Sequence, residues 1–95
     1  MKIEMYIPTG KENAIPRADL ARVLGLTDRA CRKAIEEARE RGALICNDGD
    51  GEGYYKASDI GQIERQYRVD RARALSTLKR LKTMRRMLRE NGKKV

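Results

Sequence analysis

The sequence contains no phenylalanine, no tryptophan and no histidine, and it has only four tyrosines among 95 residues. A core must therefore be built mainly from Ala, Leu, Ile and Val, and it must be small because a chain of this length supports a single domain. There is no histidine, no Gly-rich loop followed by Lys-Ser or Lys-Thr, and no pair of carboxylates outside one polar turn. We find no catalytic residues in this pattern, and we expect neither enzyme activity nor a cofactor.

Long apolar runs are also missing, so no transmembrane helix is expected. The two cysteines, Cys31 and Cys46, are too few for a structural zinc site, and their spacing matches no redox motif. Both lie among apolar residues, which is typical of buried free thiols. These features predict a protein of the reducing cytoplasm, with no metal and no membrane partner.

Basic residues outnumber acidic ones by 22 to 14, and the excess is confined to one part of the chain. Residues 1–57 hold ten of each kind, whereas residues 58–95 hold twelve Lys and Arg against four Asp and Glu. The net charge of +8 therefore lies entirely in the C-terminal part. Such asymmetry indicates a polyanionic partner, although it does not distinguish DNA from RNA or a membrane.

Residues 16–42 predict a helix, a tight turn and a second, longer helix. Apolar residues recur at helical spacing in both halves, at Leu20, Val23 and Leu24 and then at Cys31, Ala34, Ile35 and Ala38. Gly25 is the usual residue of a left-handed C-terminal cap, and Thr27 is a good N-cap for the second helix. These are the proportions of a helix-turn-helix, in which the start of the second helix reaches base edges in the major groove.

The second predicted helix presents a charged strip. If its apolar residues face the core, the exposed strip consists of Arg29, Arg32, Lys33 and Glu36. Arg can pair with guanine and Glu can accept from cytosine, and a phosphate can be held by Thr27 and the free N–H groups at the helix start. Asp28 also faces outward and is included among the expected DNA-binding residues. The alternative is an ordinary charged face in contact with solvent.

A β-hairpin is predicted next, because residues 43–46 and 54–57 are strand-like runs around a polar, Gly-rich turn. The turn is acidic, with Asp48, Asp50 and Glu52, and would repel phosphates, so we expect it to stay out of the minor groove. Together with Asp59 the spacing approaches that of a calcium loop, but the last ligand is Asp rather than Glu and strand-like sequence flanks it. We therefore predict a solvated hairpin turn.

The last predicted helix spans about residues 58–90, with Ser58 as its N-cap. It would be about 45–50 Å long, too long to pack fully on so small a domain. Apolar residues fill seven of nine a and d positions in a heptad frame. One interpretation is dimerisation, which would place two second helices on a two-fold site. The residues expected in this contact are Tyr67, Ala74, Leu78, Leu81, Met84 and Leu88.

Other interpretations of the last helix remain open: direct binding of phosphates, which can coexist with dimerisation, a basic amphipathic helix lying on a membrane, and folding back on its own domain. The helix carries ten basic residues between positions 65 and 89. Phosphate contacts are expected from Arg65, Arg68, Lys79, Arg80, Arg85 and Arg86, and from Arg17 in the first helix.

The run RADLARVLGLTDR, from Arg17 to Arg29, resembles the helix-turn-helix of winged-helix proteins. Its continuation, RGALIC at 41–46 followed by GYY at 53–55, resembles the wing of a group carried by prophages and mobile elements of Gram-positive bacteria. The resemblance covers about residues 12–57. It implies a mainly α fold with a small β-hairpin, and double-stranded DNA binding through Arg29, Arg32 and Lys33.

We therefore expect a winged helix-turn-helix domain in residues 1–57 and a long basic amphipathic helix in residues 58–95. The expected function is sequence-directed binding of double-stranded DNA by a cytoplasmic homodimer, in transcription regulation, replication or packaging for a phage or mobile element. The rival hypothesis is a protein-interaction adaptor whose last helix forms a coiled coil. The acidic turn and the net-neutral domain favour the rival.

Overall fold

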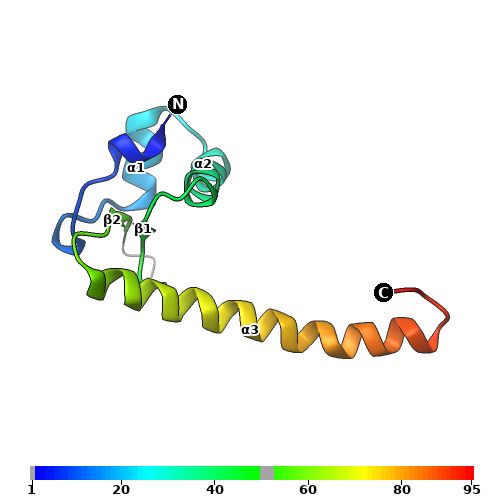
Figure 1. Ribbon diagram of the computed structural model, residues 1–95. Helices are drawn as coiled ribbons and strands as arrows, with labels where there is room; N and C mark the ends of the chain where they lie inside the picture. The colour runs from blue at the N-terminus through cyan, green and yellow to red at the C-terminus, as the bar shows by residue number, and fades with distance from the viewer. Residues whose placement is uncertain (1, 50–52) are drawn as a thin grey trace.

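The computed structural model describes residues 2–49 and 53–95. In these ranges two short 3-10 helices precede a pair of α-helices, a small β-hairpin and one long α-helix (Figure 1). The elements are η1 (Ile3–Tyr6), η2 (Lys11–Asn13), α1 (Arg17–Leu24), α2 (Asp28–Glu40), β1 (Ile45–Cys46), β2 (Tyr55–Lys56) and α3 (Ile60–Glu90). This arrangement confirms the predicted fold class, a mainly α winged helix-turn-helix with a long C-terminal helix.

The turn between α1 and α2 forms as its residue types predict. Gly25 ends α1 with a φ of 67°, in the left-handed region that glycine adopts without a steric penalty. The Thr27 side chain then accepts a hydrogen bond of 3.1 Å from the backbone N–H of Ala30, which caps the start of α2. These two caps fix the direction in which α2 leaves α1.

The core lies between α1, α2, the hairpin and the N-terminal segment. The apolar face of α2 is buried there through Cys31, Ile35 and Ala38, as its spacing predicted. Ile3 and Ile7 close the core from the N-terminal side, where η1 packs against α2. Cys31 and Cys46 are buried free thiols, and burial raises the pKa of both.

The predicted hairpin is confirmed, with strands shorter than expected. β1 and β2 pair antiparallel, with Cys46 opposite Tyr55. A further antiparallel bridge joins Ile15 to Tyr54, so the segment before α1 extends the sheet. Gly53 allows this close approach, because an added Cβ there would lie 2.9 Å from the Ile15 backbone. The hairpin is thereby held against the helix-turn-helix.

α3 begins on the hairpin and then leaves the domain (Figure 1). Its N-cap is Asp59 rather than the predicted Ser58, since the Asp59 carboxylate accepts a bond of 2.9 Å from the Gln62 N–H. Every residue from 71 to 95 is exposed. The radius of gyration is 16.8 Å, against about 12 Å for a compact domain of this length. Among the helices of the described residues, none has the length and apolar composition needed to span a membrane.

Candidate nucleic-acid interface

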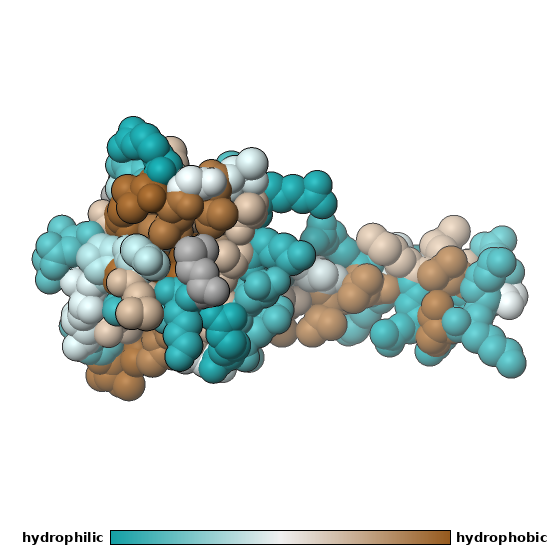
Figure 2. Space-filling model, turned by 90° about the horizontal axis from the view of Figure 1, so that it is seen from above, coloured by the Kyte–Doolittle hydropathy of each residue, from teal (hydrophilic) through white to brown (hydrophobic). Residues whose placement is uncertain are grey.

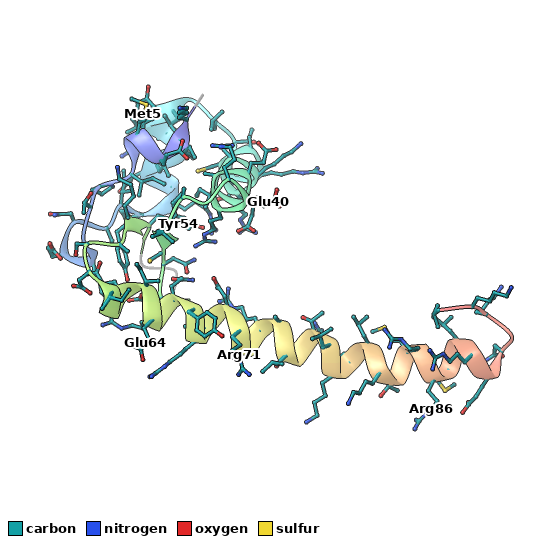
Figure 3. All side chains as sticks on the ribbon, in the orientation of Figure 1. Met5, Glu40, Tyr54, Glu64, Arg71 and Arg86 are labelled. Atoms are coloured by element: carbon teal, nitrogen blue, oxygen red, sulfur yellow. The ribbon has the colours of Figure 1, made fainter. Side chains whose placement is uncertain are left out.

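The predicted strip on α2 is exposed at every position. Arg29, Arg32, Lys33 and Glu36 all face solvent, while the opposite face of the helix packs into the core. Side chains of α2 extend on the side of the domain from which α3 projects (Figure 3). The strip therefore lies on an open surface bordered by the long helix.

The negative charge at the start of α2 is neutralised within the domain. Asp28 Oδ1 lies 2.6 Å from Arg17 Nε, and its Oδ2 lies 3.1 Å from Arg32 Nε. The hydrogen bond from Arg17 lowers the pKa of Asp28, so this carboxylate stays ionised and paired. Within the described part of the chain, Arg29 and Lys33 form no ion pair. The helix start thus presents two unpaired cations.

Four arginines from three helices converge beside this strip. They line a cleft of about 360 Å³ between α1, α2, the hairpin and α3. These arginines are Arg17 of α1, Arg32 and Arg39 of α2 and Arg73 of α3. Glu36 is the one acidic residue in the described lining. The cleft therefore favours a negatively charged ligand.

Arg39 is the member of this cleft that the sequence reasoning missed. Its guanidinium donates to the Ile45 carbonyl oxygen at 3.0 Å and to the Glu36 carboxylate at 3.0 Å, and it stacks over the Tyr54 ring at 5.9 Å. Its Nη2 is buried without a partner among the described residues. The helical spacing from Glu36 was the available signal, because residues three apart on a helix can pair.

The basic residues predicted to contact phosphates are divided between different surfaces. Arg80 lies one heptad after Arg73 and shares with it a shallow cleft on α3, next to Ser76 and Thr77. Arg65 instead approaches Asp48 at 3.5 Å, and Arg68 pairs with Glu64. Lys79, Arg85 and Arg86 are exposed. Glu64, Arg71 and Arg86 lie on the side of α3 turned away from the domain (Figure 3).

The hairpin turn differs from the prediction at Asp48, whose side chain is 6% exposed rather than solvated. Its carboxylate lies 2.8 Å from Lys11 Nζ and accepts the Tyr55 hydroxyl at 2.6 Å. Burial alone would raise the pKa of Asp48, but the bonds from Lys11 and Tyr55 outweigh it and the pKa is lowered. Asp50 and Glu52, the other acidic residues of the turn, lie outside the described residues.

The calcium-loop interpretation receives no support from the two acids that can be placed. Asp48 is held by Lys11 and Tyr55, and Asp59 caps α3. In residues 2–49 and 53–95, no group of three or more His, Cys, Asp or Glu side chains is arranged to hold a metal ion. Asp48 therefore acts as a structural anchor for the turn.

Two buried glutamines of α3 have different roles: Gln66 fastens the helix to the hairpin turn, whereas Gln62 bonds to Ser58, just before its own helix. Gln66 Oε1 accepts hydrogen bonds from the backbone N–H groups of Asn47 and Asp48, at 2.8 and 2.9 Å. Gln62 Oε1 accepts from the Ser58 N–H at 2.8 Å. Both glutamines are buried. The sequence reasoning missed them because hydrophobic periodicity does not distinguish a buried glutamine from a solvated one.

The predicted dimerisation residues form an exposed apolar stripe on the projecting part of α3. Tyr67 is 62% exposed and Leu78 is 57% exposed, and Leu81, Met84 and Leu88 are exposed as well. Ala74 lies in the same stripe and is also exposed. Figure 2 shows apolar surface along this helix, interrupted by hydrophilic side chains.

The cleft and the first two turns of α2 present guanidinium and ammonium groups. Guanidinium and ammonium groups of this kind pair with phosphates, which position a duplex, and with base edges, which specify sequence. The helix start at Thr27 adds backbone N–H groups near the same strip. No family model, no curated protein and no solved structure matches this chain.

Proposed function

We propose that the protein binds double-stranded DNA in a sequence-directed manner, with the start of α2 in the major groove, and that it does so as a cytoplasmic homodimer. The observation that carries this proposal is the convergence of Arg17, Arg32, Arg39 and Arg73 on one cleft beside the exposed strip of α2. The role that the winged-helix resemblance implies is that of a transcription regulator or a replication or packaging accessory of a phage or mobile element.

Two of the acidic residues that weigh against DNA binding are paired within the domain. Residues 1–57 have no net charge, but Asp28 is paired with Arg17 and Arg32, and Asp48 is buried with Lys11 and Tyr55. Neither carboxylate faces an incoming phosphate unpaired. Arg29 and Lys33, which form no ion pair among the described residues, are therefore the cations of the strip that remain available to phosphates.

α3 extends the cationic surface beyond the domain. In Figure 1, α2 is seen nearly end-on while α3 runs across the view, so the two helices run at a steep angle. Arg73 lines the cleft beside α2, and Arg80 continues the same face of α3. In this account α2 reads base edges while Arg73 and Arg80 contact the backbone of the same duplex.

The test is the affinity of the full chain for a labelled random duplex, measured by fluorescence anisotropy between 50 and 200 mM salt. Neutralisation of about six phosphates predicts that log affinity falls with log salt at a slope of about −5. Absence of binding at the lowest salt, or a flat response, would overturn the proposal and favour the adaptor hypothesis.

A further inference from the structure

The chain exposes more surface than a compact protein of its mass. Its accessible surface is 7155 Å², whereas a compact monomer of 10.9 kDa exposes about 5,600 Å². The apolar stripe of α3, defined above by its six residues from Tyr67 to Leu88, contributes to this excess because its own chain does not cover it. The difference exceeds the ~800 Å² that each partner buries in a stable interface. The elongated chain therefore has enough surface in excess of a compact monomer to supply an interface of that size, and the stripe is its apolar part.

At its domain end the stripe opens into an apolar groove between α3 and β1. The groove has a volume of about 280 Å³, and Ala43, Leu44, Ile63 and Tyr67 are among its lining residues. Leu44 is 56% exposed although it lies next to a buried strand. The apolar surface here is wider than one helix face, so it can accommodate the side chains of an additional helix.

The charge along α3 indicates how a second copy would be oriented. Residues 79–95 carry eight basic residues and one acidic residue, whereas residues 60–78 carry four basic and two acidic residues. A parallel pair would place the two strongly basic halves against each other. An antiparallel pair would set each basic half against the weakly charged half of its partner, where Asp70 lines the groove.

We propose that the groove and stripe are covered by a second copy of the chain whose α3 lies antiparallel, with its C-terminal half over Leu44, Ile63 and Tyr67. Leu81, Met84 and Leu88 of one chain then fill the groove of the other. The two α3 helices lie side by side with residue 75 of one chain opposite residue 75 of the other, and the two domains lie at opposite ends of this helix pair. This inference rests on the homodimer of the proposed function and not on DNA binding.

The orientation is tested by the distance between equivalent helix ends. A nitroxide attached to Glu90→Cys is measured by double electron–electron resonance in the full chain, alongside sedimentation equilibrium. Antiparallel pairing about residue 75 places the two labels about 45 Å apart, since a helix rises 1.5 Å per residue. A label at Ser76→Cys should give a short distance in the same dimer. The unlabelled wild type, whose two thiols are buried, supplies the background control.

Three results can occur. A dimer with a long distance at position 90 and a short one at position 76 supports the inference. A dimer with short distances at both positions overturns the antiparallel orientation and leaves the homodimer standing. A monomer at all concentrations overturns both the antiparallel orientation and the homodimer. DNA binding is then tested separately by the salt titration described above.

A pair of matched substitutions shows whether the stripe forms the contact. Leu81→Glu places a charge in the stripe, and Thr83→Glu places the same charge on another face of the exposed helix. We expect Leu81→Glu to convert the dimer to a monomer while Thr83→Glu leaves it intact. Equal effects of the two substitutions, or none from Leu81→Glu, would overturn the assignment of the stripe.

Discussion

The Tyr55 hydroxyl donates a hydrogen bond of 2.6 Å to the Asp48 carboxylate, inside the turn that joins β1 to β2. Lys11 reaches the same carboxylate at 2.8 Å and Arg65 of α3 approaches it at 3.5 Å. Asp48 itself has a φ of 53°, in the left-handed region that Asp and Asn tolerate better than most residues. One side chain thus connects η2, β2 and α3 behind the hairpin.

The Asp48→Asn substitution should lower the free energy of unfolding at neutral pH. The free energy of unfolding of the variant should also change less as the solution is made acidic. The pKa of Asp48 is lowered in the fold from its ordinary value of 3.8, so its contribution is present above about pH 4 and is lost as pH falls through the folded pKa. The asparagine retains the backbone conformation but loses the charge. We expect a loss of about 1–3 kcal/mol at pH 7 that shrinks toward pH 2, measured by urea unfolding. An equal loss at both pH values would contradict the proposed charge contribution.

Gln66→Met should loosen the attachment of α3 to the hairpin. The substitution keeps the length of the side chain and removes the acceptor of the Asn47 and Asp48 N–H groups. Leaving these donors unsatisfied costs about 1–3 kcal/mol, and their amide hydrogens should exchange faster. Lys82→Met, at an exposed position of the same helix, is the control and should change neither the stability nor the exchange of these amide hydrogens. Unchanged exchange at 47 and 48 would show that the glutamine does not hold the turn.

Arg29→Ala combined with Arg32→Ala should remove sequence preference while leaving much of the binding to random DNA. A bidentate arginine–guanine contact contributes about 1–3 kcal/mol of discrimination, so the ratio of specific to random affinity should fall by tenfold or more. Arg22→Ala is the matched control, because Arg22 lies on α1 and pairs with Asp19. Retention of the full ratio in the double variant would place base recognition elsewhere.

Arg73→Ala combined with Arg80→Ala should weaken binding to all duplexes equally. Each lost phosphate contact reduces the slope of log affinity against log salt by about 0.9. Arg71→Ala combined with Arg86→Ala removes the same charge from the side of α3 turned away from the domain (Figure 3). That control should leave the slope closer to the wild-type value. Similar slopes for the two double variants would mean that DNA does not distinguish between the two faces of α3.

The sequence predicted the elements that depend on local chemistry. Gly25 at a left-handed cap, Thr27 at an N-cap and the apolar spacing of α2 each act within a few residues, so their patterns can be recognised without a structure. The strip on α2 followed from the same periodicity, and its exposure is confirmed.

The long-range contacts could not be predicted in this way. Asp48 was expected in solvent because its neighbours are polar, yet Lys11 and Arg65, far away in the chain, come together around it. Gln66 is buried because two turn N–H groups need an acceptor. Arg39 joins the cleft only through the packing of α2 on the hairpin. Such roles depend on tertiary placement rather than on spacing.

Selection of bound sequences from a pool of random duplexes tests the central claim most directly. Reading of base edges by α2 in a two-fold dimer predicts an enriched consensus made of two inverted half-sites, and its loss in the Arg29→Ala, Arg32→Ala variant. Recovery of the same consensus by that variant, or no enrichment by the wild type at a salt concentration where it binds DNA, would contradict the claim that α2 selects the site.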